Sequence, residues 1–150
     1  MKLKSFRIKN YRSIVDTHWT KLAPDNITTL IGQNESGKTS VLEGLNSFYN
    51  GQINEDILRS DLSLPLISCC FEVSDQELDK ILDWQDISED IASQVRNSNN
   101  IILHREWITK NESRFFYGDD EILGAIKASK EESKRLETEL VGKAERISVE

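Results

Sequence analysis

The chain has 150 residues, the size of one ordinary domain, and carries a net charge of −7. Hydrophobic residues make up 37% and charged residues 30%, as in globular proteins with a core. The longest apolar runs are too short to span a bilayer, and the mixed segment 1–9 is not typical of a secretory signal. These properties exclude a membrane-spanning protein and a uniformly basic nucleic-acid binder, so we expect a cytoplasmic protein.

Three short strands are predicted before the first helix, over Leu3–Lys9, Ile14–Trp19 and Ile27–Ile31. The first alternates apolar and charged residues, with Phe6 and Ile8 on one face and Arg7 and Lys9 on the other. The third is a short β-branched run, which suits a buried strand.

A glycine-containing loop at Gly32–Gly37 leads into a predicted helix over Lys38–Tyr49. One stripe of this helix is apolar and comprises Val41, Leu42, Leu45, Phe48 and Tyr49. Asn50 and Gly51 follow, and such residues commonly end helices.

The middle of the chain predicts two helices and three further strands. The strands are Leu66–Val73, Ile101–Thr109 and Ser113–Tyr117, the last two forming a hairpin. Ser74 and Glu77 form a capping box that opens a helix through about Trp84, and a second helix is predicted over Asp86–Val95. Residues 97–100 are expected to be a polar loop, and residues 53–64 predict no clear element.

Composition changes after residue 118, which divides the chain into a lobe at 1–118 and a helical extension at 119–150. Apolar and small residues recur there at heptad-like spacing, although serine and lysine interrupt the seam. The segment is therefore either a surface helix packed on the domain or the start of a connector or coiled-coil arm.

Five cations precede the first acidic residue, Asp16, and they are Lys2, Lys4, Arg7, Lys9 and Arg12. Such a basic strand could face phosphates, either of a nucleotide or of DNA. Alternatively, it is a solvated strand edge on which lysines discourage aggregation.

The clearest motif is Gly32-Gln33-Asn34-Glu35-Ser36-Gly37-Lys38-Thr39, which fits the phosphate-binding pattern G-x-x-x-x-G-K-[ST]. The motif stands between a predicted strand and a predicted amphipathic helix, which is the context that it requires. We therefore predict a site for ATP with Mg²⁺.

Each residue type in this loop has a physical role. Glycines let consecutive backbone N–H groups point inward around an anion, and the helix N-terminus adds its positive dipole end. Lys38 is predicted to place its charge on the β- and γ-phosphates, where it would also act in catalysis, and Thr39 to coordinate Mg²⁺. The predicted nucleotide contacts are Gly32, Asn34, Glu35, Ser36, Gly37, Lys38, Thr39 and Ser40.

Hydrolysis needs more than this loop. An Asp-Glu pair at the end of an apolar strand normally helps to hold the metal and polarise the attacking water, and no such pair is found in the sequence, since Phe71-Glu72-Val73 has a single acid. The residues therefore support nucleotide binding, with turnover only after completion by further residues. Glu43, four residues past Thr39, is predicted to lie on a solvated face of the helix.

Two segments resemble a known group of proteins. Phe6–Ser13 and Leu30–Leu45 are similar to the start of ABC-type ATPase heads of DNA-maintenance proteins, including the RecF, RecN and structural-maintenance-of-chromosomes families. Asn34–Thr39 reads Asn-Glu-Ser-Gly-Lys-Thr, as in the overcoming-lysogenization-defect (OLD) family and related anti-phage ATPases.

This resemblance implies an α/β P-loop NTPase fold, the N-terminal lobe of an ABC-type head, with a mixed sheet and a C-terminal helix. It implies a homodimer closed through the nucleotide site, a C-terminal half of the head as partner, and a role linked to DNA repair or phage defence, with DNA as a further partner. It also places the residues after the first strand, Asn10 and Arg12, near the nucleotide. Two alternatives remain, a nucleotide-gated dimerisation module without catalysis and a fragment of a transporter's nucleotide-binding domain.

Overall fold

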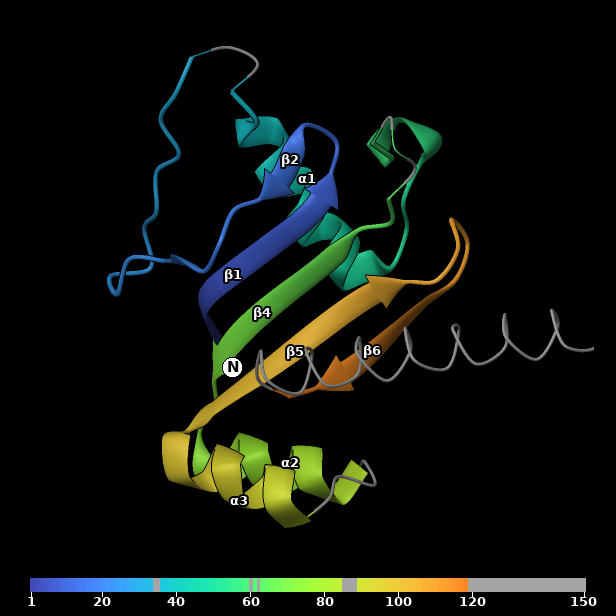
Figure 1. Cartoon of the computed structure of the whole chain (residues 1–150). Coiled ribbons are helices and arrows are strands. Elements are labelled where there is room, and N and C mark those ends of the chain that lie inside the picture. The colour runs from blue at the N-terminus through green and yellow to red at the C-terminus, as the bar shows by residue number, and fades with distance from the viewer. Residues whose placement is uncertain (34–35, 60, 62, 85–88, 119–150) are drawn as a thin grey trace, which may run out of the picture. The chain divides into compact units, whose positions relative to one another are not determined.

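Two strands, β1 (Lys2–Tyr11) and β4 (Leu66–Glu72), pair antiparallel at the centre of the sheet, and further strands pair with each of them (Figure 1). The remaining strands are β2 (Ile14–Asp16) and β3 (Thr20–Lys21), which pair with β1, β5 (Asn100–Trp107), which pairs with β4, and β6 (Ser113–Tyr117), which pairs with β5. The first strand and the hairpin are confirmed. The second predicted strand, Ile14–Trp19, is formed only in part: β2 ends at Asp16, His18 has a φ of 54°, and β3 begins beyond the predicted range.

The computed structural model describes residues 1–33, 36–59, 61, 63–84 and 89–118. The chain divides into two compact units, Met1–Tyr117 and Gly118–Glu150. The predicted helical extension at 119–150 and its heptad seam lie outside the described residues and stay predictions. Among the described helices, none has the length and apolar character needed to cross a membrane.

One face of the sheet is covered by α1 (Lys38–Asn50). Phe6 and Ile8 of β1 join Ile67 and Cys69 of β4 in a core cluster that includes Phe48 of α1. The predicted alternation of apolar and charged side chains along β1 is therefore confirmed, because Phe6 and Ile8 face the helix. The predicted stripe on α1 is too wide, since two of its members, Leu42 and Tyr49, are 61% and 87% exposed.

A second cluster lies where α2 (Asp75–Trp84) and α3 (Glu89–Ser98) meet the sheet. Its buried residues are Val73, Leu78, Val95 and Ile101. The capping box is confirmed, because Ser74 N donates to Glu77 Oε2 at 3.0 Å and Glu77 N donates to Ser74 Oγ at 3.4 Å.

Two segments differ in detail from the predictions. Helix α3 continues to Ser98 before Asn99 turns at a φ of 52°, so the predicted polar loop at 97–100 is largely wrong. The segment at 53–64, without a clear prediction, contains a short 3-10 helix, η1 (Glu55–Ile57).

The predicted buried strand Ile27–Ile31 is wrong in this structure. These residues form no strand, and Ile27 and Ile31 are 73% and 90% exposed. A β-branched run becomes a strand only where a neighbouring edge offers backbone partners, and among the described residues none pairs with it. All strand pairings in the described part of the chain are antiparallel, so the parallel portion of the predicted mixed sheet is not seen there.

Helix α1 ends at Gly51, as the sequence predicts. Gly51 adopts a left-handed conformation with a φ of 76°, and its N–H donates to Ser47 O at 2.8 Å. Arg105 and Trp107 of β5 close over this end, where Trp107 Nε1 donates to Gly51 O at 3.3 Å and Arg105 Nη1 to Ser47 O at 3.4 Å. A cation at a helix C-terminus is favourable because it complements the helix dipole.

Gly51→Ala is expected to destabilise the fold by about 2 kcal/mol, because a left-handed φ strains any L side chain. The added Cβ would also clash with Arg105 Nη1, so the guanidinium would have to move. Urea unfolding would measure the loss. Tyr49→Ala is the matched control, since this side chain is 87% exposed and its removal should change stability by less than about 0.5 kcal/mol. Equal stability of Gly51→Ala and the wild type would contradict the prediction.

Candidate functional site

The loop between Gly32 and Thr39 is organised by Lys38. Its ammonium group donates to Gly32 O at 2.7 Å and to Gln33 O at 2.6 Å, and it lies 3.3 Å from Ser36 Oγ. Ser36 N donates to Gln33 O at 3.2 Å and tightens the same turn. The Lys38 side chain therefore folds back over the loop, and its ammonium group lies among the backbone groups of the predicted phosphate-binding site.

The N-terminus of α1 is open to an anion. Gly37 precedes the helix in a left-handed conformation with a φ of 90°, and it provides no side-chain cap. The first turn contains no acidic residue. The first N–H groups of a helix have no intrahelical partner, so the start of α1 presents donors and a positive dipole end together.

The remaining predicted loop contacts differ in exposure. Thr39 is exposed, so its hydroxyl is accessible to a metal ion, whereas Ser40 is only 7% exposed and is buried. Asn34 and Glu35 lie outside the described residues. The assignments of all these residues to nucleotide or metal stay predictions.

The turn that follows β1 lies directly beside the loop. A Cβ on Gly37 would be 3.9 Å from Ile14 Cγ1 and 4.0 Å from Ser13 Oγ. Tertiary structure thus brings residues next to the first strand into contact with the start of α1.

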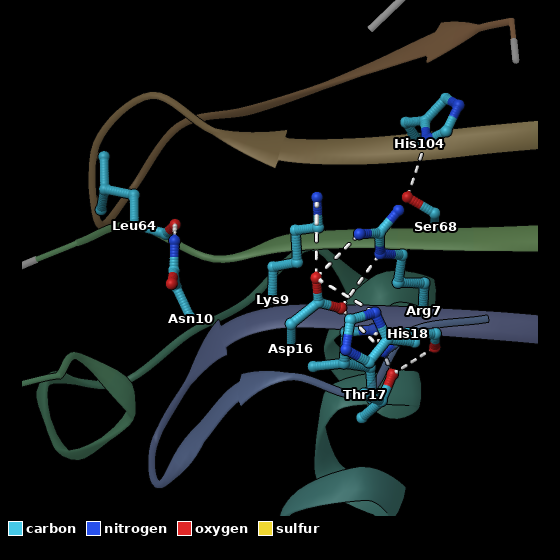
Figure 2. Close-up of polar contacts among 10 residues, drawn as sticks. Arg7, Lys9, Asn10, Asp16, Thr17, His18, Leu64, Ser68 and His104 are labelled. Carbon is cyan, nitrogen blue, oxygen red and sulfur yellow. Dashed lines mark hydrogen bonds and ion pairs between the residues drawn. The ribbon is translucent and has the colours of Figure 1, made fainter. Parts of the chain in front are cut away.

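Asn10 and Arg12 flank this turn, both with positive φ, at 56° and 52°. Asn10 Nδ2 lies 3.5 Å from Leu64 O, on the chain before β4 (Figure 2). Arg12 instead contacts α1, where its Nη1 lies 2.5 Å from Glu43 Oε2. Of the two predicted contacts, Arg12 is therefore the one tied to the helix that carries Lys38 and Thr39.

Glu43 is half-buried and paired with Arg12, rather than part of the solvated face that the sequence predicts. This pairing has no local signal in the sequence, because the two residues are distant in the chain and meet only when α1 packs on β1. Residues joined this way are not revealed by motif spacing.

The basic character of β1 is largely neutralised within the domain. Lys2 Nζ donates to Pro24 O at 2.7 Å, and Lys4 Nζ lies 3.5 Å from Glu72 Oε2. Arg7 donates two hydrogen bonds to Asp16, from Nε at 3.0 Å and from Nη2 at 2.8 Å (Figure 2).

Asp16 of β2 lies close to two cations and one histidine. Lys9 Nζ and His18 Nδ1 lie 3.9 and 4.0 Å from its Oδ2, in addition to the paired Arg7. The hydrogen bond from Arg7 holds the pKa of Asp16 at about 2, well below its ordinary 3.8. β1 is also an interior strand, so it is not a solvated strand edge. That β1 faces phosphates stays a prediction, which the ion pairs of its cations do not favour.

His104 and the two cysteines lie on the interior strands β5 and β4. His104 is fully buried and shares a 2.7 Å hydrogen bond with Ser68 Oγ (Figure 2). Its ring stacks on Phe116. Cys69 is buried and Cys70 half-buried, and burial raises the pKa of the Cys69 thiol to about 12. Within the described ranges, no group of three or more histidine, cysteine or acidic residues could hold a metal ion.

Together, the antiparallel sheet, the covering helix and the lysine-centred loop define a P-loop nucleotide-binding α/β domain. The model of the AAA ATPase domain family matches residues 1–148. The chain therefore belongs to the AAA ATPase domain family.

Other comparisons add less. A search of curated proteins finds no match. A solved chain from work on ATP-driven dimerization and DNA stimulated activation of SMC ATPases is 13% identical, with a TM-score of 0.49, over 87% of this chain and 80% of that chain. At this score the likeness adds nothing to the assignment.

Asp16→Asn is expected to destabilise the domain by about 2 kcal/mol at pH 7, because hydrogen bonds to the charged carboxylate are lost. The folded-state pKa is depressed, so the contribution is fully present above the ordinary pKa of 3.8 and is lost as the pH falls toward 2. Urea unfolding of both proteins at pH 7, 4 and 3 would show the difference shrinking with acidity. Asp79→Asn, an exposed change on α2, serves as control. A difference independent of pH would show that charge is not its source.

Proposed function

We propose that the chain binds ATP with Mg²⁺ at the loop Gly32–Thr39 as part of an ATPase. The observation that carries this proposal is the Lys38 ammonium among the carbonyls of Gly32 and Gln33, at the uncapped and acid-free N-terminus of α1. A mobile cation next to unused backbone donors suits a polyphosphate.

The residues present fit the nucleotide and the metal. Lys38 would exchange its bonds to the loop carbonyls for bonds to the β- and γ-phosphates, since charge-assisted bonds to phosphate are the stronger ones. The Thr39 hydroxyl, which is exposed one residue further along, would hold Mg²⁺. When bound, the ion would neutralise charge that develops on the phosphates.

A partner lobe is the second part of the proposal. Ile27 and Ile31 are exposed in a segment whose β-branched sequence favours a strand, immediately before the loop. A further lobe of the ATPase head, supplying strand neighbours to this segment, would bury these side chains and hold the loop from its N-terminal side. We assign the missing metal-binding carboxylate to that lobe.

The finer role rests on the resemblance of Phe6–Ser13 and Leu30–Leu45 to ATPase heads of the OLD, RecF and structural-maintenance-of-chromosomes group. We propose a DNA-linked repair or anti-phage ATPase whose heads form a homodimer around ATP. The ion pairs of Arg7 and Lys9 with Asp16 argue against β1 as the DNA-binding surface.

ATP binding should depend on Lys38. We expect Lys38→Ala to weaken Mg·ATP binding by about 100-fold or more, because two or more charge-assisted contacts are lost together. Isothermal titration calorimetry would give both affinities. Lys80→Ala, which removes an exposed lysine from α2, should bind as the wild type does. Equal affinity of Lys38→Ala and wild type would refute the site.

Turnover separates the enzyme from a nucleotide-gated module. For this chain alone we expect binding with negligible phosphate release, because its sequence offers no apolar strand that ends in an Asp-Glu pair. Glu72, the single acid that ends β4, is paired with Lys4 at the start of β1. Phosphate release should appear when the complete ATPase is assayed and should be abolished by Lys38→Ala. Binding without turnover in the complete protein would favour a gated module that closes a dimer without catalysis.

A further inference from the structure

We infer that β6 is a surface through which two copies of this chain associate: the two strands pair edge to edge and antiparallel, with Phe115 opposite the partner's Phe115. This inference is independent of the proposed ATP site, because it uses no residue of the loop Gly32–Thr39.

β6 forms one edge of the sheet (Figure 1). It pairs with β5 and, among the described residues, with no other strand. Ile108 N donates to Glu112 O at 2.9 Å, which marks a hydrogen-bonded pair next to the β5–β6 ladder. Such pairs alternate with pairs that share no hydrogen bond, so every second residue of β6 directs its backbone N–H and C=O away from β5. These outward-facing residues are Ser113, Phe115 and Tyr117.

The two edges of the sheet differ in how far they discourage association. Proteins protect exposed edges with very short strands, lysines, prolines and bulges. At the other edge, β2 and β3 contain only three and two residues. β6 contains five residues, without lysine, proline or a break in its register with β5. Its one charge, on Arg114, is bound by Glu106, whose Oε2 lies 2.8 Å from Nη2.

Phe115 is the apolar centre of this edge. Its side chain is 47% exposed, although its ring packs edge-on against Phe48, with the centroids 5.4 Å apart. The guanidinium carbon of Arg105 lies 3.9 Å from the centroid of the same ring. These contacts fix the ring without covering it. Opposite residues in a hydrogen-bonded pair have Cα atoms about 5.5 Å apart, so a second Phe115 would cover the exposed part and remove apolar surface from water.

The register centred on Phe115 makes the strand self-complementary. Outward-facing residues must oppose outward-facing residues, which rules out a slip of one residue. With Phe115 at the centre, Ser113 lies opposite the partner's Tyr117. Arg114 then lies opposite the partner's Phe116, where a cation–π contact is favourable. Such reciprocal contacts are what a twofold interface between identical copies requires.

The neighbouring symmetric registers are less favourable. With Arg114 at the centre, two arginines would lie directly opposite each other, and like charges in that position are destabilising. With Phe116 at the centre, Ser113 would lie outside the paired strands. Charge and strand length therefore both select the register centred on Phe115.

This pairing would join two sheets into one. Opposite residues of antiparallel strands lie on the same face, so the α1 helices of both copies would cover the same face of the joined sheet. The contact is confined to two five-residue strands, and an interface below about 1,200 Å² is typical of weak complexes. We expect a dissociation constant on the order of 10–100 µM.

Analytical ultracentrifugation without nucleotide measures this association. We expect the wild type to pass from a 17.2 kDa monomer to a dimer as its concentration rises through that range. Phe115→Glu should weaken association at least about tenfold, because two carboxylates would face each other. Phe115→Lys should do the same, whereas an equimolar mixture of the two variants should associate, since opposite charges then meet. Ile108→Glu, at an exposed apolar residue outside β6, should associate as the wild type does.

Cysteine cross-linking tests the register with a smaller change. Phe115→Cys should form disulfide-linked dimers under mild oxidation, because Cα atoms about 5.5 Å apart suit a disulfide. Ser113→Cys should not, since this position lies opposite Tyr117. The wild type gives the background from Cys70, which is half-buried. Melting temperatures identify any charged variant that has lost its fold, and cross-linking then decides the outcome.

Three results would overturn the inference. They are a wild type that stays monomeric over the whole range, association that neither Phe115→Glu nor Phe115→Lys weakens, and cross-linking of Ser113→Cys as fast as that of Phe115→Cys. None of them bears on the ATP site, because nucleotide is absent throughout. Lys38→Ala should associate as the wild type does, so a failure of ATP binding would leave this inference standing.

Discussion

The packing of α1 on the β1–β4 pair positions the helix side of the candidate site. Ile8 and Ile67 are fully buried beneath the helix, so the helix cannot slide or rotate without exposing them. The same contact places Gly37 against the turn after β1 and Glu43 against Arg12. The position of a phosphate-binding loop depends on the helix that follows it, and here that helix is fixed by its packing on the centre of the sheet.

The described residues at the start of α1 carry no acid, although the chain as a whole is acidic. The net charge is −7, yet the first turn of α1 has no acid and Lys38 is bound only to neutral loop groups in the described structure. The cations of β1 are instead engaged by Asp16, Glu72 and a backbone carbonyl. Local pairing, rather than the overall balance, therefore decides where an anion is attracted.

The exposed run before the loop offers a place for the further lobe to which we assign the metal-binding carboxylate. Ile27–Ile31 leads into Gly32 without a strand partner among the described residues, so only the helix side of the loop is firmly anchored. A lobe that pairs with this run would couple its own attachment to the shape of the phosphate cradle. Attachment of the lobe would then raise the affinity for the nucleotide, and the nucleotide would raise the affinity for the lobe.

The sequence by itself determined the loop, its lysine, the helix that follows, the capping box at Ser74 and the hairpin of β5 and β6. These features are encoded by residues close together in the chain, where turn chemistry and apolar periodicity act. Only the tertiary structure decided the outcome at Ile27–Ile31, whose strand-forming residues lack a neighbouring edge in the described domain, and at Leu42 and Tyr49, which the packing of α1 leaves exposed. It also decided the pairing of Arg12 with Glu43 and of Arg7 with Asp16, because side chains on different elements meet only through packing that no local pattern records.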